Sequence, residues 1–294
     1  MYKSHVSFLK GLLLYGGLTA VFSAIVVAVA LFYIPNTKLE TNTASLQDAV
    51  LSQPLTTDTW GIFDPNTGKV LASNNTDEVH PIASISKLFI ALAVMQSDKQ
   101  NDTFTIFASD VNTEGRSGKL YVGEKITPYE LLFPLLIESS NDAAVAIARY
   151  INGSFEKTMN DAVATLPLPN TTIIEPSGLS ARNTSTVKDL ATFFAYVKHT
   201  QPHLLDITRL RMYISQRTGY VNNDPASALS SFVGGKNGYT YEAGRTFVGA
   251  FQSESGKNEI GMVILGSTDL IHDISILQNQ GEKILKSSAI LSQP

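Results

Sequence analysis

An uncharged segment near the N-terminus places the strongest constraint on this chain. Residues 11–34 contain no Asp, Glu, Lys or Arg, and as a helix they would extend roughly 36 Å, enough to cross a bilayer. Lys3 and Lys10 precede this segment, so the positive-inside bias predicts that residues 1–10 are cytoplasmic and that the remaining chain lies outside. The alternative is a cleaved signal peptide. We favour it less, because the apolar run is too long for a signal core and no small-residue cleavage site follows it.

The chain after this segment is expected to be a linker followed by one domain. Residues 35–56 are polar and rich in Thr and Asn, which is typical of a linker. No break in composition divides residues 57–294, so we predict a single domain there. The net charge of −4 argues against a nucleic-acid partner. The absence of cysteine excludes disulfides, thiol catalysis and cysteine-ligated metals.

Periodicity and turn residues predict a mixed α/β domain. The expected elements are a hairpin over 59–73, a fully buried helix over 88–95, a helical stretch over 126–153 interrupted at "ESSND", helices over 154–166 and 185–199, two strands around a glycine-rich turn within 230–252, a strand over 258–267 and a helix over 269–288. Strands at both ends with helices between them predict an antiparallel sheet packed with helices, together with a central helical region.

The pattern Ser-x-x-Lys occurs four times, beginning at Ser7, Ser84, Ser154 and Ser185. Only Lys87, the partner of Ser84, precedes a helix that is apolar on every side and is therefore expected to be buried. Residues three apart share a helix face, so the amine can reach the hydroxyl. Burial lowers a lysine pKa, and a neutral lysine can take the proton of a serine nucleophile. The alternative is two polar residues that merely share a helix face.

Two further segments could complete a site. In "SSN", Ser139 and Asn141 lie at the break between two helices, where a hydroxyl and an amide can point into one cleft; a simple turn between helices is the alternative. In "GGKNGYT", glycines around Lys236 would let a ligand approach a strand closely while an ammonium binds its anionic group. The alternative is an ordinary hairpin turn, which the dipeptide Asn237–Gly238 favours.

The ordered motifs "SISK", "SSN" and "KNG" resemble the Ser-x-x-Lys, Ser-x-Asn and Lys-Thr-Gly motifs of penicillin-binding proteins and serine β-lactamases. The segments "DPNTGKVLASNNTDEVHPIASISKL" and "KNGYTYEAGRTFVGAF" are similar to those of one branch, the low-molecular-mass serine D-alanyl-D-alanine carboxypeptidases. The similarity extends from about Trp60 to Gly266. It implies a β-lactamase/DD-peptidase-like fold. The uncharged segment over 11–34 adds a single membrane-spanning helix, which would place this domain on the outer side of the cell membrane.

The resemblance also implies a role for each motif residue. Ser84 would be the acylated nucleophile, Lys87 its base, and Ser139 the relay that passes a proton to the leaving D-alanine. The backbone N–H groups of Ser84 and Tyr239 would form an oxyanion hole, worth about 3 kcal/mol per donor. The substrate-binding residues implied are Asn141, Lys236, Asn237, Gly238, Tyr239, Thr240 and Arg245. The substrate would be a peptidoglycan stem peptide and β-lactams would be inhibitors, with no metal or cofactor.

The sequence departs from the family pattern at Asn237, where threonine is usual, and we expect Arg245 to compensate in binding the substrate carboxylate. No β-rich tail domain is expected after Gly266, and the anchor is expected at the N-terminus rather than the C-terminus. Two alternatives stay open. In a β-lactamase, Glu175 of "IIEPSGLS" would activate the deacylating water. In a catalytically weak peptidoglycan-binding protein on the same fold, Asn237 would have impaired substrate recognition.

Overall fold

The computed structural model describes residues 54–115, 118–152 and 166–291, which belong to one compact unit. The predicted membrane span over 11–34 and nearly all of the predicted linker lie outside these residues, as does all but the last residue of the predicted helix over 154–166. Within the described ranges, no helix has both the length and the apolar character required to cross a membrane.

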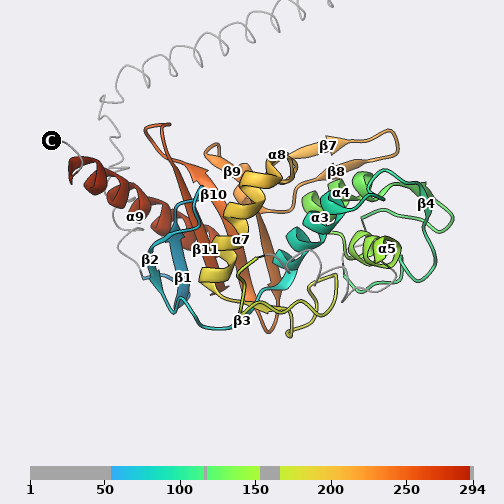
Figure 1. The fold of residues 1–294 in the computed structure, drawn as a ribbon, viewed down its shortest axis with the longest axis horizontal. Helices are drawn as coiled ribbons and strands as arrows, with labels where there is room; N and C mark the ends of the chain where they lie inside the picture. The colour runs from blue at the N-terminus through green and yellow to red at the C-terminus, as the bar shows by residue number, and fades with distance from the viewer. Residues whose placement is uncertain (1–53, 116–117, 153–165, 292–294) are drawn as a thin grey trace, which may run out of the picture. The chain divides into compact units, whose positions relative to one another are not determined.

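An antiparallel sheet of five strands, in the order β2-β1-β11-β10-β9, forms the centre of the fold (Figure 1). Its strands are β1 (Thr59–Phe63), β2 (Val70–Asn74), β9 (Phe232–Thr240), β10 (Gly244–Gln252) and β11 (Glu259–Ser267). The N-terminal hairpin joins the C-terminal strands because β1 pairs with β11. The predicted hairpin, the predicted final strand and the antiparallel sheet are therefore confirmed.

Both faces of the sheet are covered by helices. Along β11, Met262 and Ile264 belong to a cluster with residues of α9 (Leu270–Leu291), whereas Val263 and Leu265 belong to a cluster with residues of α7 (Val187–Thr200). Side chains alternate between the two faces of a strand, so a strand buried on both sides is apolar at every position. This explains the unbroken apolar run in β11.

The helices α3 (Ser86–Gln96), α4 (Pro128–Ile137) and α5 (Asn141–Asn152) gather on the side of the domain away from α9 (Figure 1). The predicted capping box is present at the start of α4, where Thr127 and Glu130 bond each other's backbone N–H groups. The predicted interruption separates α4 from α5. Elements that the sequence did not predict are α8 (Pro202–Arg209), the hairpin β7 (Met212–Ile214) with β8 (Gly219–Val221), the short strands β3 (His80–Pro81), β4 (Phe104–Thr105), β5 (Lys125–Ile126) and β6 (Thr184–Ser185), and the 3₁₀ turns η1 (Ala83–Ile85) and η2 (Pro225–Ala228).

The prediction of a glycine-rich turn within 230–252 was wrong. The glycines lie inside β9, and the chain turns at residues 241–243 instead. A Cβ on Gly238 would lie 2.6 Å from the backbone nitrogen of Ser84, so this glycine allows the strand to approach the nucleophile segment rather than to reverse. Gly244, with φ +61°, takes the left-handed conformation that ends the actual turn.

Candidate active site

The candidate nucleophile lies where β3 gives way to a helix. Ser84 is the middle residue of η1, directly before α3, and it is half-buried. Ala83 before it has φ 48°, a left-handed conformation that is uncommon for a residue with a side chain. Helix α3 is buried on nearly every side, and Lys87 in its first turn has no exposed surface. The burial predicted for Lys87 from the apolar helix is therefore observed.

The Lys87 ammonium nitrogen connects three segments of the chain. Its Nζ donates to Ser84 Oγ at 3.0 Å, to Asn141 Oδ1 at 2.8 Å and to the backbone carbonyl of Ser177. The first of these contacts is within the reach that proton transfer requires. The spacing of three residues alone would apply equally to Lys188, which is exposed on α7.

The "SSN" motif supplies the second segment. Ser139 lies in the break between α4 and α5 with φ 60°, another left-handed conformation outside glycine. Asn141 begins α5, and its Nδ2 donates to the carbonyl of Glu114 at 2.6 Å. A backbone carbonyl can only accept a hydrogen bond, so the atom of the Asn141 amide that faces Glu114 is the nitrogen and the atom that faces Lys87 is the oxygen. The strained backbone at Ser139 and the fixed amide of Asn141 both favour a preorganised functional site over a simple turn between helices.

The third segment is the loop that contains "EPSGLS". The Glu175 carboxylate accepts hydrogen bonds from the backbone N–H groups of Ser177, Gly178 and Ser180. It also accepts from the Ser177 hydroxyl and from Asn183 Nδ2. Both of its oxygens therefore face the loop itself, and Glu175 is not among the residues that line the pocket. This arrangement does not favour Glu175 as a base that activates water.

Strand β9 forms the opposite side of the site. Lys236 is 1% exposed, and its Nζ donates to the backbone carbonyl of Asn237 at 2.8 Å and to Asn237 Oδ1 at 3.1 Å. Arg245 on β10 pairs with Tyr239 in the sheet, and its guanidinium carbon lies 5.6 Å from the centre of the Tyr239 ring. Burial raises the pKa of the nearby carboxyl of Asp224, and the positive charge of Lys236 opposes this rise.

Strand β9 and the nucleophile segment are in close contact. Gly238 approaches the Ser84 backbone nitrogen, as described above, and on β10 the hydroxyl of Thr246 donates to the carbonyl of Ile82 at 2.9 Å. The backbone nitrogen of Ser84 therefore lies beside β9. This placement is compatible with the predicted oxyanion hole of Ser84 and Tyr239.

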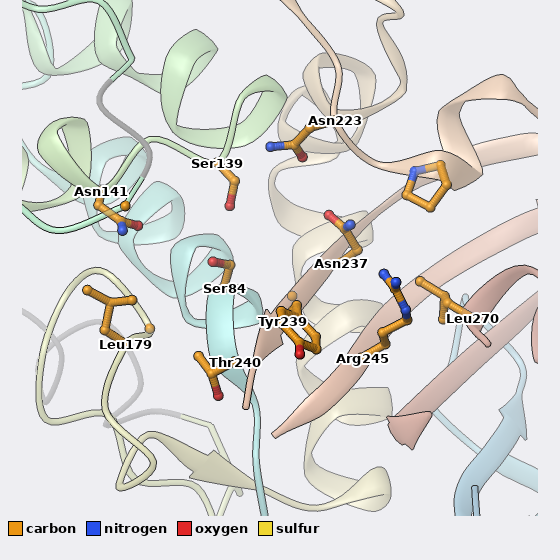
Figure 2. Close-up of a pocket in the computed structure, with 14 residues that line it drawn as sticks. Ser84, Ser139, Asn141, Leu179, Asn223, Asn237, Tyr239, Thr240, Arg245 and Leu270 are labelled. Atoms are coloured by element: carbon orange, nitrogen blue, oxygen red, sulfur yellow. The ribbon is translucent and has the colours of Figure 1, made fainter. Parts of the chain in front are cut away.

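These segments surround a cavity of about 500 Å³ (Figure 2). In Figure 2, Ser84, Ser139 and Asn141 lie on one side of it, and Asn237 and Arg245 lie on the other. The predicted residues that line it are Ser84, Ser139, Asn141, Asn237, Gly238, Tyr239, Thr240 and Arg245. Lys87 and Lys236 are not in its lining and are buried.

Six lining residues carried no recognised signal in the sequence: Gly115, Gly178, Leu179, Asn223, Pro225 and Leu270. All but Leu270 belong to loops or turns, which reach the pocket through tertiary packing rather than through a motif. Asn223, for example, is held there by its Nδ2, which donates to the carbonyl of Glu138 at 2.5 Å. The contact of Ser177 was also missed, because a backbone carbonyl leaves no signature in residue type. Among the described residues, no group of three His, Cys, Asp or Glu side chains could hold a metal ion.

Comparison with known proteins shows which family this chain is similar to. The family model described as "D-alanyl-D-alanine carboxypeptidase" matches residues 45–268. A D-alanyl-D-alanine endopeptidase of Pseudomonas aeruginosa is 39% identical over 145 residues, which are 48% of this chain and 47% of that protein. The carboxypeptidase DacB2 of Mycobacterium tuberculosis is 32% identical over 202 residues, 65% of this chain and 69% of that protein. The match thus spans about half the length of the first of these relatives.

Solved structures show the same fold. A crystal structure of a D-alanyl-D-alanine carboxypeptidase from Mycobacterium tuberculosis matches with a TM-score of 0.70 and 28% identity, over 78% of this chain and 93% of that one. Penicillin-binding protein D2 from Listeria monocytogenes, in its cefotaxime-bound form, matches with a TM-score of 0.68 and 22% identity, over 79% of this chain and 98% of that one. The predicted DD-peptidase-like fold is therefore confirmed for the described domain.

Proposed function

Because this chain belongs to the D-alanyl-D-alanine carboxypeptidase family, we propose that it is a serine hydrolase that removes the terminal D-alanine from peptidoglycan stem peptides. The observation that carries the proposal is the 3.0 Å contact between Lys87 Nζ and Ser84 Oγ at the edge of the cavity. A hydroxyl next to a buried amine is the arrangement that serine acylation requires.

The proposed reaction proceeds in two halves. Ser84 Oγ attacks the carbonyl carbon of the penultimate D-alanine while its proton passes to Lys87. The carbon–nitrogen bond then breaks, and the leaving D-alanine amine takes up a proton through Ser139. Water attacks the resulting ester, which releases the shortened peptide as a carboxylic acid and restores the Ser84 hydroxyl. The backbone N–H groups of Ser84 and Tyr239 would stabilise the oxyanion in both halves.

Substrate binding in this proposal involves both sides of the cavity. Asn141 would hold the peptide amide, while Lys236 and Arg245 would attract the terminal carboxylate. Asn237 would add an N–H donor to that carboxylate, since its Oδ1 already accepts from Lys236. Gly238 would let the substrate backbone lie close to β9, where Thr240 lines the cavity.

We further propose that residues 11–34 anchor the domain to the cell membrane, with the catalytic domain outside. The absence of charge over those residues and the lysines before them support this topology. The substrate, peptidoglycan, lies on the same side. Protease accessibility of residues 57–294 in intact cells would test it, and protection of the domain until the cells are lysed would contradict it.

The decisive experiment is acylation by fluorescent penicillin together with release of D-alanine from a stem pentapeptide. Wild-type protein should be labelled and should release D-alanine, and Ser84→Ala should do neither. Because the relatives include an endopeptidase by name, a cross-linked muropeptide dimer should be tested beside the pentapeptide. Wild-type protein that is never acylated would contradict the proposed mechanism.

One observation favours a second candidate function, a peptidoglycan-binding protein with weak catalysis. Lys236 already donates to two oxygens of Asn237, which leaves less of its hydrogen-bonding capacity for a substrate carboxylate. In that case wild-type protein would bind stem peptides but release D-alanine slowly. Asn237→Thr would then raise the rate of release, whereas an equal or lower rate in this variant would support the carboxypeptidase.

A further inference from the structure

The orientation of the Lys87 amine depends on two carbonyl oxygens. To accept a proton, the neutral amine must direct its lone pair at Ser84, and its two N–H bonds must point elsewhere. Asn141 Oδ1 and the Ser177 carbonyl can only accept hydrogen bonds. When these two oxygens take the N–H bonds, the remaining position of the nitrogen faces Ser84 Oγ, 3.0 Å away. Both carbonyls are therefore required to orient the lone pair of Lys87 towards Ser84.

The Ser177 carbonyl lies in a loop without regular secondary structure, so other contacts must fix its position. The Glu175 side chain provides them. Its two oxygens accept from five donors within residues 177–183, at distances of 2.5 to 3.1 Å. The backbone of Glu175 is held as well, because Asn183 Nδ2 donates to its carbonyl at 2.9 Å.

The same loop is packed directly against the nucleophile segment. A Cβ on Gly178 would lie 2.3 Å from the carbonyl oxygen of Ala83 and 2.7 Å from Ser86 Oγ. Gly178 also has φ +85°, which glycine adopts without strain. The loop is therefore packed tightly between η1 and the hydrogen bonds of the Glu175 carboxylate. A shift of those hydrogen bonds would move the Ser177 carbonyl relative to Lys87.

We infer that Glu175 is a positioning residue for Lys87, which it aims at Ser84 by holding the Ser177 carbonyl in place. The inference rests on the proposed function, because it assigns Lys87 the role of base. Glu175 itself touches neither Lys87 nor the cavity among the contacts described above. Its main effect should therefore appear in the acylation step, with a smaller effect on the initial binding of a β-lactam, because Gly178 and Leu179 of the same loop line the cavity.

The test is Glu175→Gln in the full-length protein, with acylation by fluorescent penicillin followed at several concentrations. A carboxamide has one accepting oxygen in place of two, and its NH₂ would face N–H donors of the loop. We expect the acylation rate constant at saturation to fall by roughly 10- to 100-fold, the scale of a displaced catalytic group. The concentration that gives half-saturation should change much less than the rate constant, because the substituted side chain does not itself line the cavity.

Glu130→Gln is the matched control. Glu130 also bonds backbone and hydroxyl groups, in the capping box of α4, but it does not line the cavity. This variant should lose thermal stability and acylate as fast as wild type per folded molecule. If Glu175→Gln behaves in the same way, with lower stability and an unchanged acylation rate constant, Glu175 is only structural and the inference is wrong.

Two further variants keep the inference testable if Glu175→Gln folds poorly. Glu175→Asp retains the carboxylate on a shorter stem and should give an intermediate acylation rate. Ser177→Ala removes one of the five donors but leaves the carbonyl, and should give a smaller loss. Wild-type rates in both folded variants would contradict the inference.

A double-mutant comparison tests the same inference. In a Lys87→Ala background, Glu175→Asp should cause no further loss of acylation rate, because the group that Glu175 positions is gone. Additive losses would contradict the inference.

Acylation of the wild-type protein distinguishes a failure of this inference from a failure of the proposed function. If wild-type protein is not acylated at all, the proposed mechanism fails, and the assignment of Glu175 fails with it. If wild-type protein is acylated and Glu175→Gln matches it, only the role of Glu175 is refuted.

Discussion

The two sides of the cavity are organised differently. On the nucleophile side, Lys87 is buried and donates to Ser84, Asn141 and Ser177, groups from three separate segments. On the β9 side, Lys236 is buried as well and donates to two oxygens of the next residue, Asn237, whereas Arg245 is exposed and contacts an exposed tyrosine ring.

In the proposed reaction, this difference would separate the groups that perform the chemistry from those that recognise the substrate. Groups that transfer protons must be aligned before the substrate arrives, because small displacements reduce the rate. A group that recognises a carboxylate can remain solvated until the carboxylate binds, and Arg245 is exposed in this way. The departure from the family pattern, Asn237, lies on the second side. The comparison predicts that disruption of the first side abolishes chemistry, and that disruption of the second side weakens binding.

Removal of the base should have the largest effect. Lys87→Ala should lower the rate of penicillin acylation by about 10²- to 10⁴-fold, the contribution of a positioned general base. Lys188→Ala is the matched control, since Lys188 has the same spacing from a serine but is exposed. Stopped-flow or gel-based labelling would measure both. A Lys87→Ala protein that acylates at the wild-type rate would remove the distinction between the two sides.

Substitution of Gly238, where the two sides of the cavity meet, should have the next largest effect on the acylation rate. In Gly238→Ala the added methyl would lie 2.6 Å from the Ser84 nitrogen, so β9 or η1 must shift. We expect acylation to slow by about 10²-fold, comparable to the loss of one oxyanion-hole donor. Gly219→Ala in β8 is the control, because nothing lies within 4 Å of the Cβ that it adds. Equal rates in both variants would show that the approach of β9 to Ser84 is not required.

Arg245→Ala should affect recognition rather than chemistry. For a pentapeptide with a free terminal carboxylate, we expect KM to rise about tenfold while kcat changes little, as when a charge-assisted contact of about 1.5 kcal/mol is lost. A substrate whose carboxylate is amidated should not distinguish the variant from wild type. Arg209→Ala, on an exposed part of α8, serves as the control. A fall in kcat with an unchanged KM would instead indicate that Arg245 contributes to the chemical step.

The smallest expected effect is on stability and comes from Asp224, near the β9 side. Burial raises the pKa of Asp224 above its ordinary value. The folded protein then keeps this proton at a pH where the unfolded chain has released it. The stabilisation from this group is therefore complete below about pH 4 and is lost as the pH rises through the raised pKa.

Asp224→Asn does not titrate at this position, so its thermal midpoint should fall less than that of wild type as the pH rises from about 4 to 8. The two curves of thermal midpoint against pH should therefore diverge, and in a domain of this size each difference of about 1 kcal/mol shifts the midpoint by about 2–4 °C. Thermal unfolding followed by circular dichroism at several pH values would measure it. Parallel curves for the two proteins would show that Asp224 does not titrate differently in the folded state.

Much of the fold could be predicted from local patterns. The capping box of Thr127 and Glu130, the apolar helix after Lys87 and the unbroken apolar run of β11 each depend on neighbours in sequence. The glycine-rich segment of β9 was misassigned to a turn, because Asn237–Gly238 has the local chemistry of a hairpin. The reason for the glycine is a contact with Ser84, more than 150 residues away in the sequence.

The sequence by itself determined which residue types are available: a serine three residues from a lysine, a hydroxyl and an amide at a helix break, and a lysine among glycines. It also favoured Ser84 over the other serines, because the helix that follows must be buried. Only the tertiary structure decided that the backbone carbonyl of Ser177 accepts a hydrogen bond from Lys87 and that the Glu175 carboxylate bonds groups of its own loop. Backbone groups are the same at every residue, so their positions depend on the folded chain and not on its composition.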